Sequence, residues 1–280
     1  MPSDVLALFD LDHTLLVLDS DEAWVEFLIG EGALDRAVFE QGNRAIVERY
    51  RRGEVGVLEF TEFYLATLKD RDPRQLNAWR GDYLTRSIWP AIPAASRTLV
   101  ERHRLAGDLL VLTTATSRFL TAPIANELGF EHLIATEPEM IAGRYTGKVS
   151  GTPNMREGKV VRLEAWLAQR RQRLDDFRES WFYSDSRNDV PLLERITHPV
   201  AVNPDPTLAA LARARAWPVR CRCCGRRACS RPPIWAMAAW TIRRWITPRW
   251  AMTRPAQWQG LSMCRRSARR RARRCWAMST

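Results

Sequence analysis

Short apolar runs recur along the chain, and each is closed by polar residues. The first, residues 5–9, reads Val-Leu-Ala-Leu-Phe and is followed directly by Asp10. A run this short with a polar boundary is typical of a buried strand. Similar runs predict further strands at residues 109–113, 132–135, 181–184 and 199–202.

Between these runs, apolar residues recur at helical spacing. Helices are predicted over residues 94–105, 119–128, 156–171, 189–194 and 205–215, and a small hairpin over residues 139–151. Strands that alternate with helices of this length form a parallel sheet with helices on both faces. The pattern therefore predicts an α/β fold built on a Rossmann-like, doubly wound parallel sheet.

The stretch from residue 16 to residue 89 departs from this alternation. It has no alternating strand pattern, and Ser20-Asp21-Glu22 has the chemistry of a helix start. Further amphipathic helices are expected over residues 34–50, 57–68 and 73–88. We interpret residues 16–89 as a helical cap inserted into a catalytic core of residues 1–15 and 90–218.

Amino-acid usage changes abruptly at residue 219. Residues 219–280 hold sixteen arginines, six tryptophans and all six cysteines, but no Asp, Glu, Lys or His. Without these arginines the net charge of +11 becomes −5 for residues 1–218, so the basic character belongs to the tail. We interpret residues 219–280 as the product of a reading-frame shift, a tail never selected to fold and expected to be unstructured.

The tail also has a functional interpretation. A basic extension that carries aromatic side chains could bind nucleic acid or an anionic membrane surface. A zinc site is not favoured, because Cys221, Cys223, Cys224 and Cys229 do not form two C-x-x-C pairs. We expect no nucleic-acid partner unless the basic tail is a genuine product of the gene.

The sequence of residues 1–218 indicates the cellular compartment of the protein. Residues 1–218 contain no cysteine, and Met1 is followed by Pro-Ser-Asp rather than by the basic and apolar regions of a signal peptide. No apolar run reaches the length of about eighteen residues that a membrane span needs. We therefore expect a cytoplasmic protein with no membrane partner.

Polar side chains follow three of the predicted strands. Asp10 and Asp12 follow residues 5–9, Thr114 follows residues 109–113, and Asp185 follows residues 181–184. Ligands of parallel sheets bind outside the carboxyl ends of the strands. Two carboxylates two residues apart on extended chain point to the same side, and a bound cation offsets their repulsion. Oxygen ligands without a full cage favour Mg²⁺.

Other residues near these strand ends suit phosphate chemistry. Thr114 leads through Ala115 towards a predicted helix start, where backbone N–H groups can hold phosphate oxygens. Lys159, one of only three lysines in the chain, lies at the start of another predicted helix. Taken together, these residues predict an enzyme that acts on a phosphate ester.

Four short segments, in this order, resemble the motifs of the haloacid dehalogenase-like (HAD) phosphatase superfamily. They are Asp10-Leu11-Asp12-His13-Thr14, Thr114, Lys159 and the segment from Asp185 to Asp189. The resemblance covers residues 4–218, and the helical insertion after the first motif is similar to the subgroup that contains phosphoserine phosphatase and bacterial histidinol-phosphate phosphatases. It implies a Mg²⁺-dependent phosphomonoester hydrolase.

The resemblance also implies a role for each residue. Asp10 would be the nucleophile that forms an aspartyl-phosphate. Asp12 would protonate the leaving alkoxide and later deprotonate the attacking water. Thr114 and Lys159 would neutralise the phosphoryl oxygens. The metal would be held by Asp10, by the backbone carbonyl of Asp12 and by Asp185, with Asn188 and Asp189 orienting the site from close by.

The substrate is harder to predict. The resemblance implies a cap acid about nine residues after the nucleophile, where Asp19 stands with Asp21 and Glu22 nearby, and substrate contacts are expected from Asp19, Glu22 and Ala115. It also implies a cap arginine for a substrate carboxylate, yet residues 59–64 contain none, and only Arg49, Arg51 and Arg52 could replace it. An amine binder without a clear carboxylate binder favours L-histidinol phosphate, with phosphoserine or another small phosphorylated metabolite as the alternative.

Overall fold

A six-stranded parallel sheet forms the centre of the computed structural model, which describes residues 3–220. The strand order is β3-β2-β1-β6-β7-β8. The strands are β1 (Val5–Phe9), β2 (Leu109–Ser117), β3 (His132–Thr136), β6 (Glu179–Ser184), β7 (His198–Val202) and β8 (Val219–Arg220). All neighbouring pairs in this sheet are parallel, which confirms the predicted α/β class.

The strand order reverses direction at β1. The chain goes from β1 outward to β2 and β3, and later strands continue from the other side of β1 through β6. Phe9, the last residue of β1, lies opposite Leu112 of β2 and Tyr183 of β6. Such a reversal opens a crevice at the carboxyl ends of the strands, which is where doubly wound sheets bind ligands.

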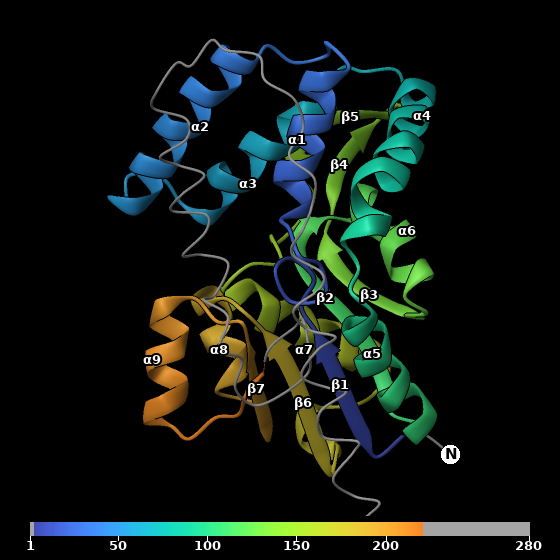
Figure 1. Ribbon diagram of the computed structural model, residues 1–280, viewed down its shortest axis with the longest axis vertical. Helices are drawn as coiled ribbons and strands as arrows, with labels where there is room; N and C mark the ends of the chain where they lie inside the picture. The colour runs from blue at the N-terminus through green and yellow to red at the C-terminus, as the bar shows by residue number, and fades with distance from the viewer. Residues whose placement is uncertain (1–2, 221–280) are drawn as a thin grey trace, which may run out of the picture. The chain divides into compact units, whose positions relative to one another are not determined.

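Helices cover both faces of the sheet (Figure 1). Ala7 and Phe9 of β1 face a core shared with α5 and α6, whereas Leu6 and Leu8 face a second core shared with α7, α8 and α9. Successive strand residues point to opposite faces, so the continuous apolar run of β1 fills both cores. The helices are α5 (Ala94–Ala106), α6 (Arg118–Glu127), α7 (Glu157–Gln169), α8 (Val190–Leu193) and α9 (Pro206–Ala214).

Residues 20–88, within the segment expected to form a cap, are mostly helical. The segment contains α1 (Ser20–Gly30), α2 (Arg36–Arg51), α3 (Val57–Leu65) and α4 (Pro73–Tyr83), followed by a π-helical turn, η2 (Leu84–Ile88). Asp19, Asp35 and Asp72 are the N-cap residues directly before α1, α2 and α4, and each accepts a hydrogen bond from a backbone N–H of the first turn. We call α1 to α4 the cap helices.

The predicted hairpin is present between β3 and α7. It pairs β4 (Pro138–Ile141) with β5 (Arg144–Val149) in antiparallel fashion. Ala142 and Gly143 form its two-residue turn with positive φ angles of 49° and 75°, as a type I′ turn requires. Gly147 in β5 has a φ of 81°, and its backbone lies against the short helix η1 (Ala66–Leu68) that follows α3.

Two strands differ most from the sequence prediction. β2 continues to Ser117 rather than ending at Thr113, because residues beyond Thr113 still pair with β3, with a register shift between Thr114 and Ser117. The two residues of β8 lie just past the predicted core boundary and pair with Ala201 and Val202. A strand of two residues is too short to produce a hydrophobic pattern. The rest of the predicted tail lies outside the described residues.

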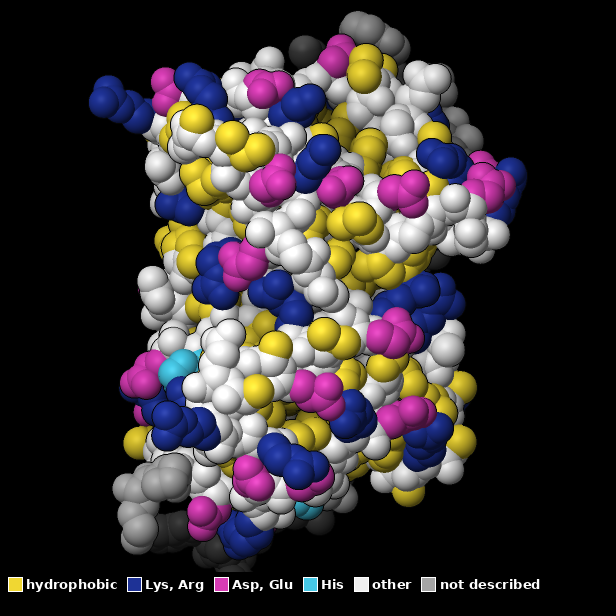
Figure 2. All heavy atoms as spheres, turned by 180° about the vertical axis from the view of Figure 1, so that it is seen from behind, with side chains coloured by type: hydrophobic (Ala, Val, Ile, Leu, Met, Phe, Trp, Pro, Cys, Tyr) yellow, Lys and Arg dark blue, Asp and Glu magenta, His cyan; other side chains and the backbone are white. Residues whose placement is uncertain are grey.

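The surface of the described residues carries both signs of charge. Figure 2 shows acidic and basic side chains intermixed over one face. This distribution agrees with a net charge near −5 for residues 1–218. Within residues 3–220, no helix is both long and apolar enough to cross a lipid bilayer.

Candidate active site

The polar residues expected at the strand ends meet around Asp10. Asp10 follows β1 directly, and its backbone N–H donates to the carbonyl of Tyr183 in β6 at 2.9 Å. This hydrogen bond extends the parallel pairing by one residue beyond β1 and places Asp10 beside the end of β6, where Asp185 follows. Asp10 is only 6% exposed.

Lys159 supplies a buried positive charge to the site. It lies in the first turn of α7 and is 2% exposed. Its Nζ donates to Asp10 Oδ1 at 2.8 Å and to Asp189 Oδ2 at 2.8 Å. Burial alone would lower the pKa of Lys159, but the two carboxylates outweigh it and hold this pKa above its ordinary value. Lys159 is therefore a permanent cation between Asp10 and Asp189.

Thr14 links the first motif to the loop after β6. Its hydroxyl donates to Asp10 Oδ2 at 3.1 Å and lies 3.4 Å from Asp185 Oδ1. The same hydroxyl oxygen accepts from the backbone N–H of Asp185 at 3.0 Å. One small side chain thus holds two predicted metal ligands side by side.

Asn188 and Asp189 lie in the short helix η5 (Arg187–Asp189) that follows β6. Besides Lys159, Asp189 accepts from the hydroxyl of Ser184 at 2.7 Å and is 2% exposed. Asn188 Oδ1 accepts from Arg156 Nε at 3.4 Å. Asp189 thus orients Lys159, and Asn188 connects the same helix to the residues that precede α7.

Asp12 is held by donors from two different elements. Its Oδ1 accepts from the backbone N–H of Ser20, the first residue of α1, at 2.8 Å. Its Oδ2 accepts from the hydroxyl of Thr116 in β2 at 2.9 Å. Asp12 is therefore held at the start of α1, whereas Asp10 is held by Lys159 and Thr14.

Burial sets the protonation of these carboxyl groups. It raises the pKa of Asp10 to about 7, against the opposing charge of Lys159. Burial likewise raises the pKa of Asp12 to about 6, with Asp19 adding to the rise. The pKa of Asp185 is raised well above its usual value, again mainly by burial and then by Asp10. Lys159 alone does not neutralise this group of carboxylates, so a further cation at the site is electrostatically favoured.

These oxygen atoms fit a Mg²⁺ ion with an incomplete protein shell. Within residues 3–220, no three acidic, histidine or cysteine side chains converge into a complete cage. Mg²⁺ in phosphate-transfer sites takes one or two carboxylates and completes its shell with water and substrate phosphate. Asp10 and Asp185 bridged by Thr14 match that donor set, with the backbone carbonyl of Asp12 as the third predicted protein ligand.

The end of β2 forms the predicted phosphate side of the site. Thr114 is fully buried, and its hydroxyl oxygen accepts from the backbone N–H of Thr116 at 3.2 Å. The carbonyl of Thr114 accepts from Asn154 Nδ2 at 2.9 Å, which ties β2 to the loop before α7. Ala115 lies between the two threonines and is half-buried. This arrangement fixes the backbone that the sequence predicts to hold phosphate oxygens.

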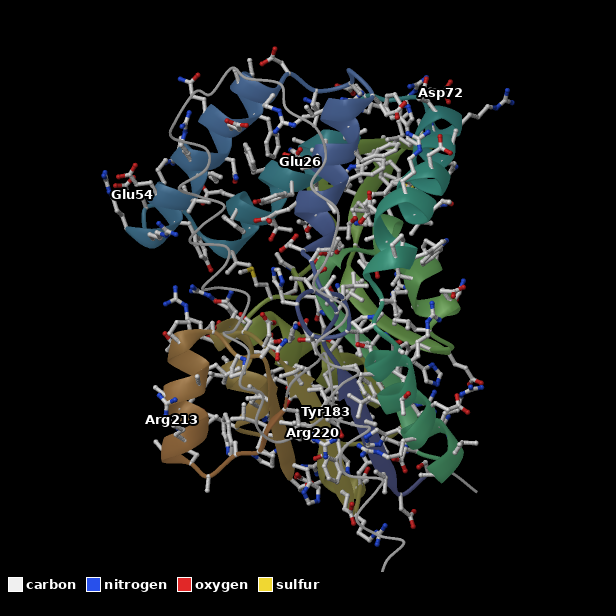
Figure 3. All side chains as sticks on the ribbon, viewed as in Figure 1. Glu26, Glu54, Asp72, Tyr183, Arg213 and Arg220 are labelled. Carbon is white, nitrogen blue, oxygen red and sulfur yellow. The ribbon has the colours of Figure 1, made fainter. Side chains whose placement is uncertain are left out.

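The predicted substrate acids lie at the start of α1. Asp19 accepts from the backbone N–H of Glu22 at 2.9 Å, and burial raises the pKa of Asp19 to about 7. Burial also raises the pKa of Tyr64 in α3, and the negative charges of Asp19 and Glu22 add to the rise. Asp19 and Glu22 line a hollow of about 610 Å³. The other side chains that line it include His13, Glu26, Phe27 and Ser87. Glu26 is labelled on α1 in Figure 3.

The sequence predicts a role for the backbone of residues 115–117, but none for the side chains of Thr116 and Arg156. Arg156 adopts a φ of 54° and a ψ of −126° at the start of α7, and its guanidinium lies 4.8 Å from the ring centroid of Tyr50 in α2. The sequence offers Arg49 and Arg52 instead, but these are about half exposed and pair with Glu54 and Glu48. No motif marks Thr116 or Arg156, because each becomes important only through the elements that the fold brings to it.

Comparisons with known proteins give the family that this chain resembles. Residues 7–194 match the family described as haloacid dehalogenase-like hydrolase. A histidinol-phosphatase of Neisseria meningitidis is 40% identical over 215 residues, which cover 76% of this chain and 97% of that protein. A probable phosphatase of Mycobacterium tuberculosis is 29% identical over 76% of this chain and 74% of its own length.

Solved structures give the same fold. A protein of unknown function from Bordetella pertussis superposes with a TM-score of 0.74 and 50% identity, over 78% of this chain and 98% of that chain. A substrate-bound phosphoserine phosphatase superposes with a TM-score of 0.54 over 75% of this chain and 90% of its own, but at 16% identity it supports the fold alone.

Proposed function

Because the chain belongs to the haloacid dehalogenase-like hydrolase family and is a phosphatase, we propose that it hydrolyses a small amino-containing phosphate ester through an aspartyl-phosphate on Asp10. The observation that carries this chemistry is the position of Asp10, buried between the Lys159 ammonium at 2.8 Å and the Thr14 hydroxyl at 3.1 Å. Asp10 is thereby held in one orientation, whereas an ordinary surface carboxylate rotates freely.

The first half-reaction transfers the phosphoryl group to Asp10. A carboxylate oxygen of Asp10 attacks phosphorus, and the bond from phosphorus to the ester oxygen breaks. Asp12, protonated at this stage, gives its proton to the departing alkoxide. A pKa of about 6 for Asp12 keeps both of its protonation states accessible near neutral pH. Lys159 and Thr114 offset the charge on the phosphoryl oxygens.

The second half-reaction releases inorganic phosphate. Asp12, now ionised, takes a proton from a water molecule, and the resulting oxygen nucleophile attacks phosphorus. The bond between Asp10 and phosphorus breaks, which regenerates both carboxyl groups. A Mg²⁺ ion held by Asp10, Asp185 and the carbonyl of Asp12, when bound, supplies positive charge that lets an anionic carboxylate approach an anionic phosphate. Asn188 and Asp189 keep this side of the site in place.

We propose L-histidinol phosphate as the substrate. A sequence identity of 40% over nearly the full length of a histidinol-phosphatase supports this choice. Asp19 and Glu22 offer negative charge to a substrate ammonium group, while residues 59–64 offer no arginine to a carboxylate. The expected organisation is a core of residues 1–15 and 90–218 with a substrate-selecting cap of residues 16–89. We assign the reaction to the cytoplasm, in keeping with the lack of cysteine in residues 1–218.

Two measurements test the proposal. The Asp10→Asn variant should lose turnover by several orders of magnitude while retaining the thermal unfolding profile of a folded protein. The value of kcat/KM should be higher for L-histidinol phosphate than for L-phosphoserine. Full activity of Asp10→Asn contradicts the mechanism, whereas a strong preference for L-phosphoserine contradicts only the substrate.

A further inference from the structure

The Thr116 side chain lies where three polar side chains meet, yet the sequence predicts a role only for its backbone. It is 2% exposed, and its Oγ1 is 2.9 Å from Asp12 Oδ2, 3.0 Å from Asp21 Oδ2 and 3.2 Å from Ser20 Oγ. Ser20 and Asp21 belong to the first turn of α1, whereas Thr116 belongs to β2. We propose that the Thr116 hydroxyl is a positioning group that fixes the carboxyl of Asp12 for proton transfer.

This inference rests on the proposed role of Asp12 as proton carrier and adds a specific support for it. The Asp12 carboxyl has one donor on each oxygen, the Ser20 N–H on Oδ1 and the Thr116 hydroxyl on Oδ2. Two donors on opposite oxygens fix the plane of a carboxyl group, whereas one donor leaves it free to turn about its last torsion, which is a soft one. Thr116 is therefore the contact that determines the orientation.

The Thr116 hydroxyl can donate to only one carboxylate at a time. A threonine hydroxyl has one proton to donate and two lone pairs to accept with. Ser20 Oγ donates to Thr116 Oγ1 at 3.2 Å, which uses one of the lone pairs. The single proton of Thr116 then serves either Asp12 or Asp21, whose oxygens lie at nearly equal distances. Asp21 thus competes with Asp12 for the donor that sets the orientation.

The first turn of α1 is itself held firmly. Tyr83, the last residue of α4, donates from its hydroxyl to the Ser20 carbonyl at 2.8 Å, and both residues are fully buried. Thr116 is fixed from its own strand by the bond from its N–H to Thr114. Asp12 is consequently oriented by two anchored groups, one from the cap helices and one from the sheet, and its geometry depends on their staying together.

The choice of leaving group separates this role from a general structural one. An alkoxide needs a proton as it departs, whereas p-nitrophenolate is stable without one. The value of kcat/KM covers the steps up to cleavage of the ester bond, where only the alkyl ester depends on Asp12 as an acid. Misplacement of such an acid costs about 10–100-fold in rate.

The test uses Thr116→Val, which removes the hydroxyl and keeps the shape, with Thr116→Ser as the conservative variant. The substrates are p-nitrophenyl phosphate and whichever of L-histidinol phosphate and L-phosphoserine the wild type hydrolyses faster. Thr116→Val should lower kcat/KM by about 10–100-fold for the alkyl ester and by less than about threefold for the aryl ester. Thr116→Ser should restore the alkyl ester to within about threefold of the wild type.

Thr121→Val is the matched control. Thr121 is also fully buried. Its hydroxyl donates to the Ser117 carbonyl at 2.9 Å rather than to Asp12. Its replacement should leave both kcat/KM values unchanged. If Thr116→Val does not fold, Thr116→Ala carries the same comparison.

An equal loss on both substrates, or no loss on either, overturns the inference. A wild-type protein that hydrolyses neither ester contradicts the proposed function instead.

Discussion

Lys159 determines the electrostatics of the site at the scale of single residues. It is 2% exposed and contacts two carboxylates, Asp10 and Asp189, both at 2.8 Å. Removing one member of a buried ionic group leaves an uncompensated charge, which costs about 3–5 kcal/mol. The same residue is thus needed for folding stability and for charge neutralisation during the reaction.

Lys159→Met should therefore lower the free energy of unfolding by about 3–5 kcal/mol near pH 8 and abolish phosphatase activity. The measurement is urea unfolding of the metal-free protein together with turnover. Arg195→Met is the matched control, since Arg195 pairs with Glu164 at 2.7 Å with both side chains about half exposed. Such an exposed pair contributes about 0–1 kcal/mol, so equal losses in the two variants would contradict the argument.

The raised pKa of Asp10 predicts how Mg²⁺ binding depends on pH. Folding raises this pKa from 3.8 to about 7, so the folded state holds the proton more tightly and the stability contributed by Asp10 is lost as pH rises through this window. Mg²⁺ requires the ionised form, so its apparent affinity should fall about tenfold per pH unit below about pH 7. Between pH 7 and pH 5 the stabilisation by Mg²⁺ should decrease by about 2–3 kcal/mol.

Thermal unfolding with and without MgCl₂ at pH 5 and pH 8 measures this dependence. The rise in Tm on adding Mg²⁺ should be clearly larger at pH 8. Asp10→Asn removes the titrating group and should weaken the pH dependence of the Mg²⁺ effect. A rise in Tm of the same size at both pH values in the wild type would show that burial of Asp10 does not control metal binding.

The sequence predicts which side chains meet where the topology of the sheet decides their positions. Asp10 and Asp185 were expected to be close because parallel strands end at one edge of the sheet, and Thr14 lies between them at 3.1 Å and 3.4 Å. Thr116 has no such signal, because its importance comes from a register shift in β2 and from the approach of α1. Contacts of this kind depend on packing, which a pattern of single residues does not encode.

At the scale of elements, α1 and α4 pack differently from α2 among the cap helices. Trp24 of α1 is 1% exposed and packs against Tyr83 of α4 and Phe119 of α6, with ring centroids 5.3 Å and 6.0 Å away. In contrast, α2 has no buried residue, and its Tyr50 lies 4.8 Å from the guanidinium of Arg156. The pair α1 and α4 shares a core with the sheet layer, whereas α2 is held by fewer buried contacts.

Hydrogen exchange should reveal this division. We expect amides of α2 to exchange at least tenfold faster than those of α1, because local opening is easiest where little apolar surface is buried. Mass spectrometry of peptides that cover Arg36–Arg51 and Ser20–Gly30 measures the difference. Tyr50→Leu, which removes the stacking with Arg156, should increase the exchange of α2 further and leave α1 unchanged. Equal protection of the two helices would refute the division.

The β4–β5 hairpin contacts the short helix η1 and the residue that follows it. A methyl group on Gly147 would lie 3.2 Å from the Ala66 Cα and 3.2 Å from the Lys69 Cβ, and its φ of 81° is unfavourable for other residues. Gly143, in the turn of the same hairpin, has a similar φ of 75° but open space around it. Gly143→Ala therefore tests backbone strain alone, and Gly147→Ala tests strain and close approach together.

Gly143→Ala should destabilise by about 1 kcal/mol and Gly147→Ala by about 2–3 kcal/mol, as measured by urea unfolding. Only Gly147→Ala should also change KM, because it displaces the helix η1 next to α3. The sequence predicts this hairpin from its turn-forming residues. It does not predict that Gly147 is the contact with the cap, since that depends on where α3 lies.

At the scale of the whole molecule, the described chain and the basic tail differ in charge and composition. Residues 1–220 carry a net charge of −4, because Arg220 adds one positive charge to the −5 of residues 1–218. Their six-stranded sheet ends with β8, whose last residue is Arg220. The composition changes at residue 219, yet Val219 and Arg220 still pair with β7, so these two residues belong to the sheet rather than to the predicted tail.

A chain truncated after Arg220 should keep the phosphatase activity, with kcat/KM within about threefold of the full chain. The groups that donate to the carboxylates of Asp10 and Asp12 in the described part of the chain belong to Thr14, Ser20, Thr116 and Lys159, and the truncated chain retains all four. The truncated chain should not bind DNA, because an acidic protein with mixed surface charge neutralises few DNA phosphates and therefore releases few of their counterions. The full chain should bind DNA with an affinity that falls steeply with salt, as fifteen further arginines would dictate. Fluorescence anisotropy across a salt series measures DNA binding by both chains.

DNA binding by the truncated chain would assign nucleic-acid affinity to the catalytic part, whereas lost activity would show that the phosphatase needs residues beyond Arg220.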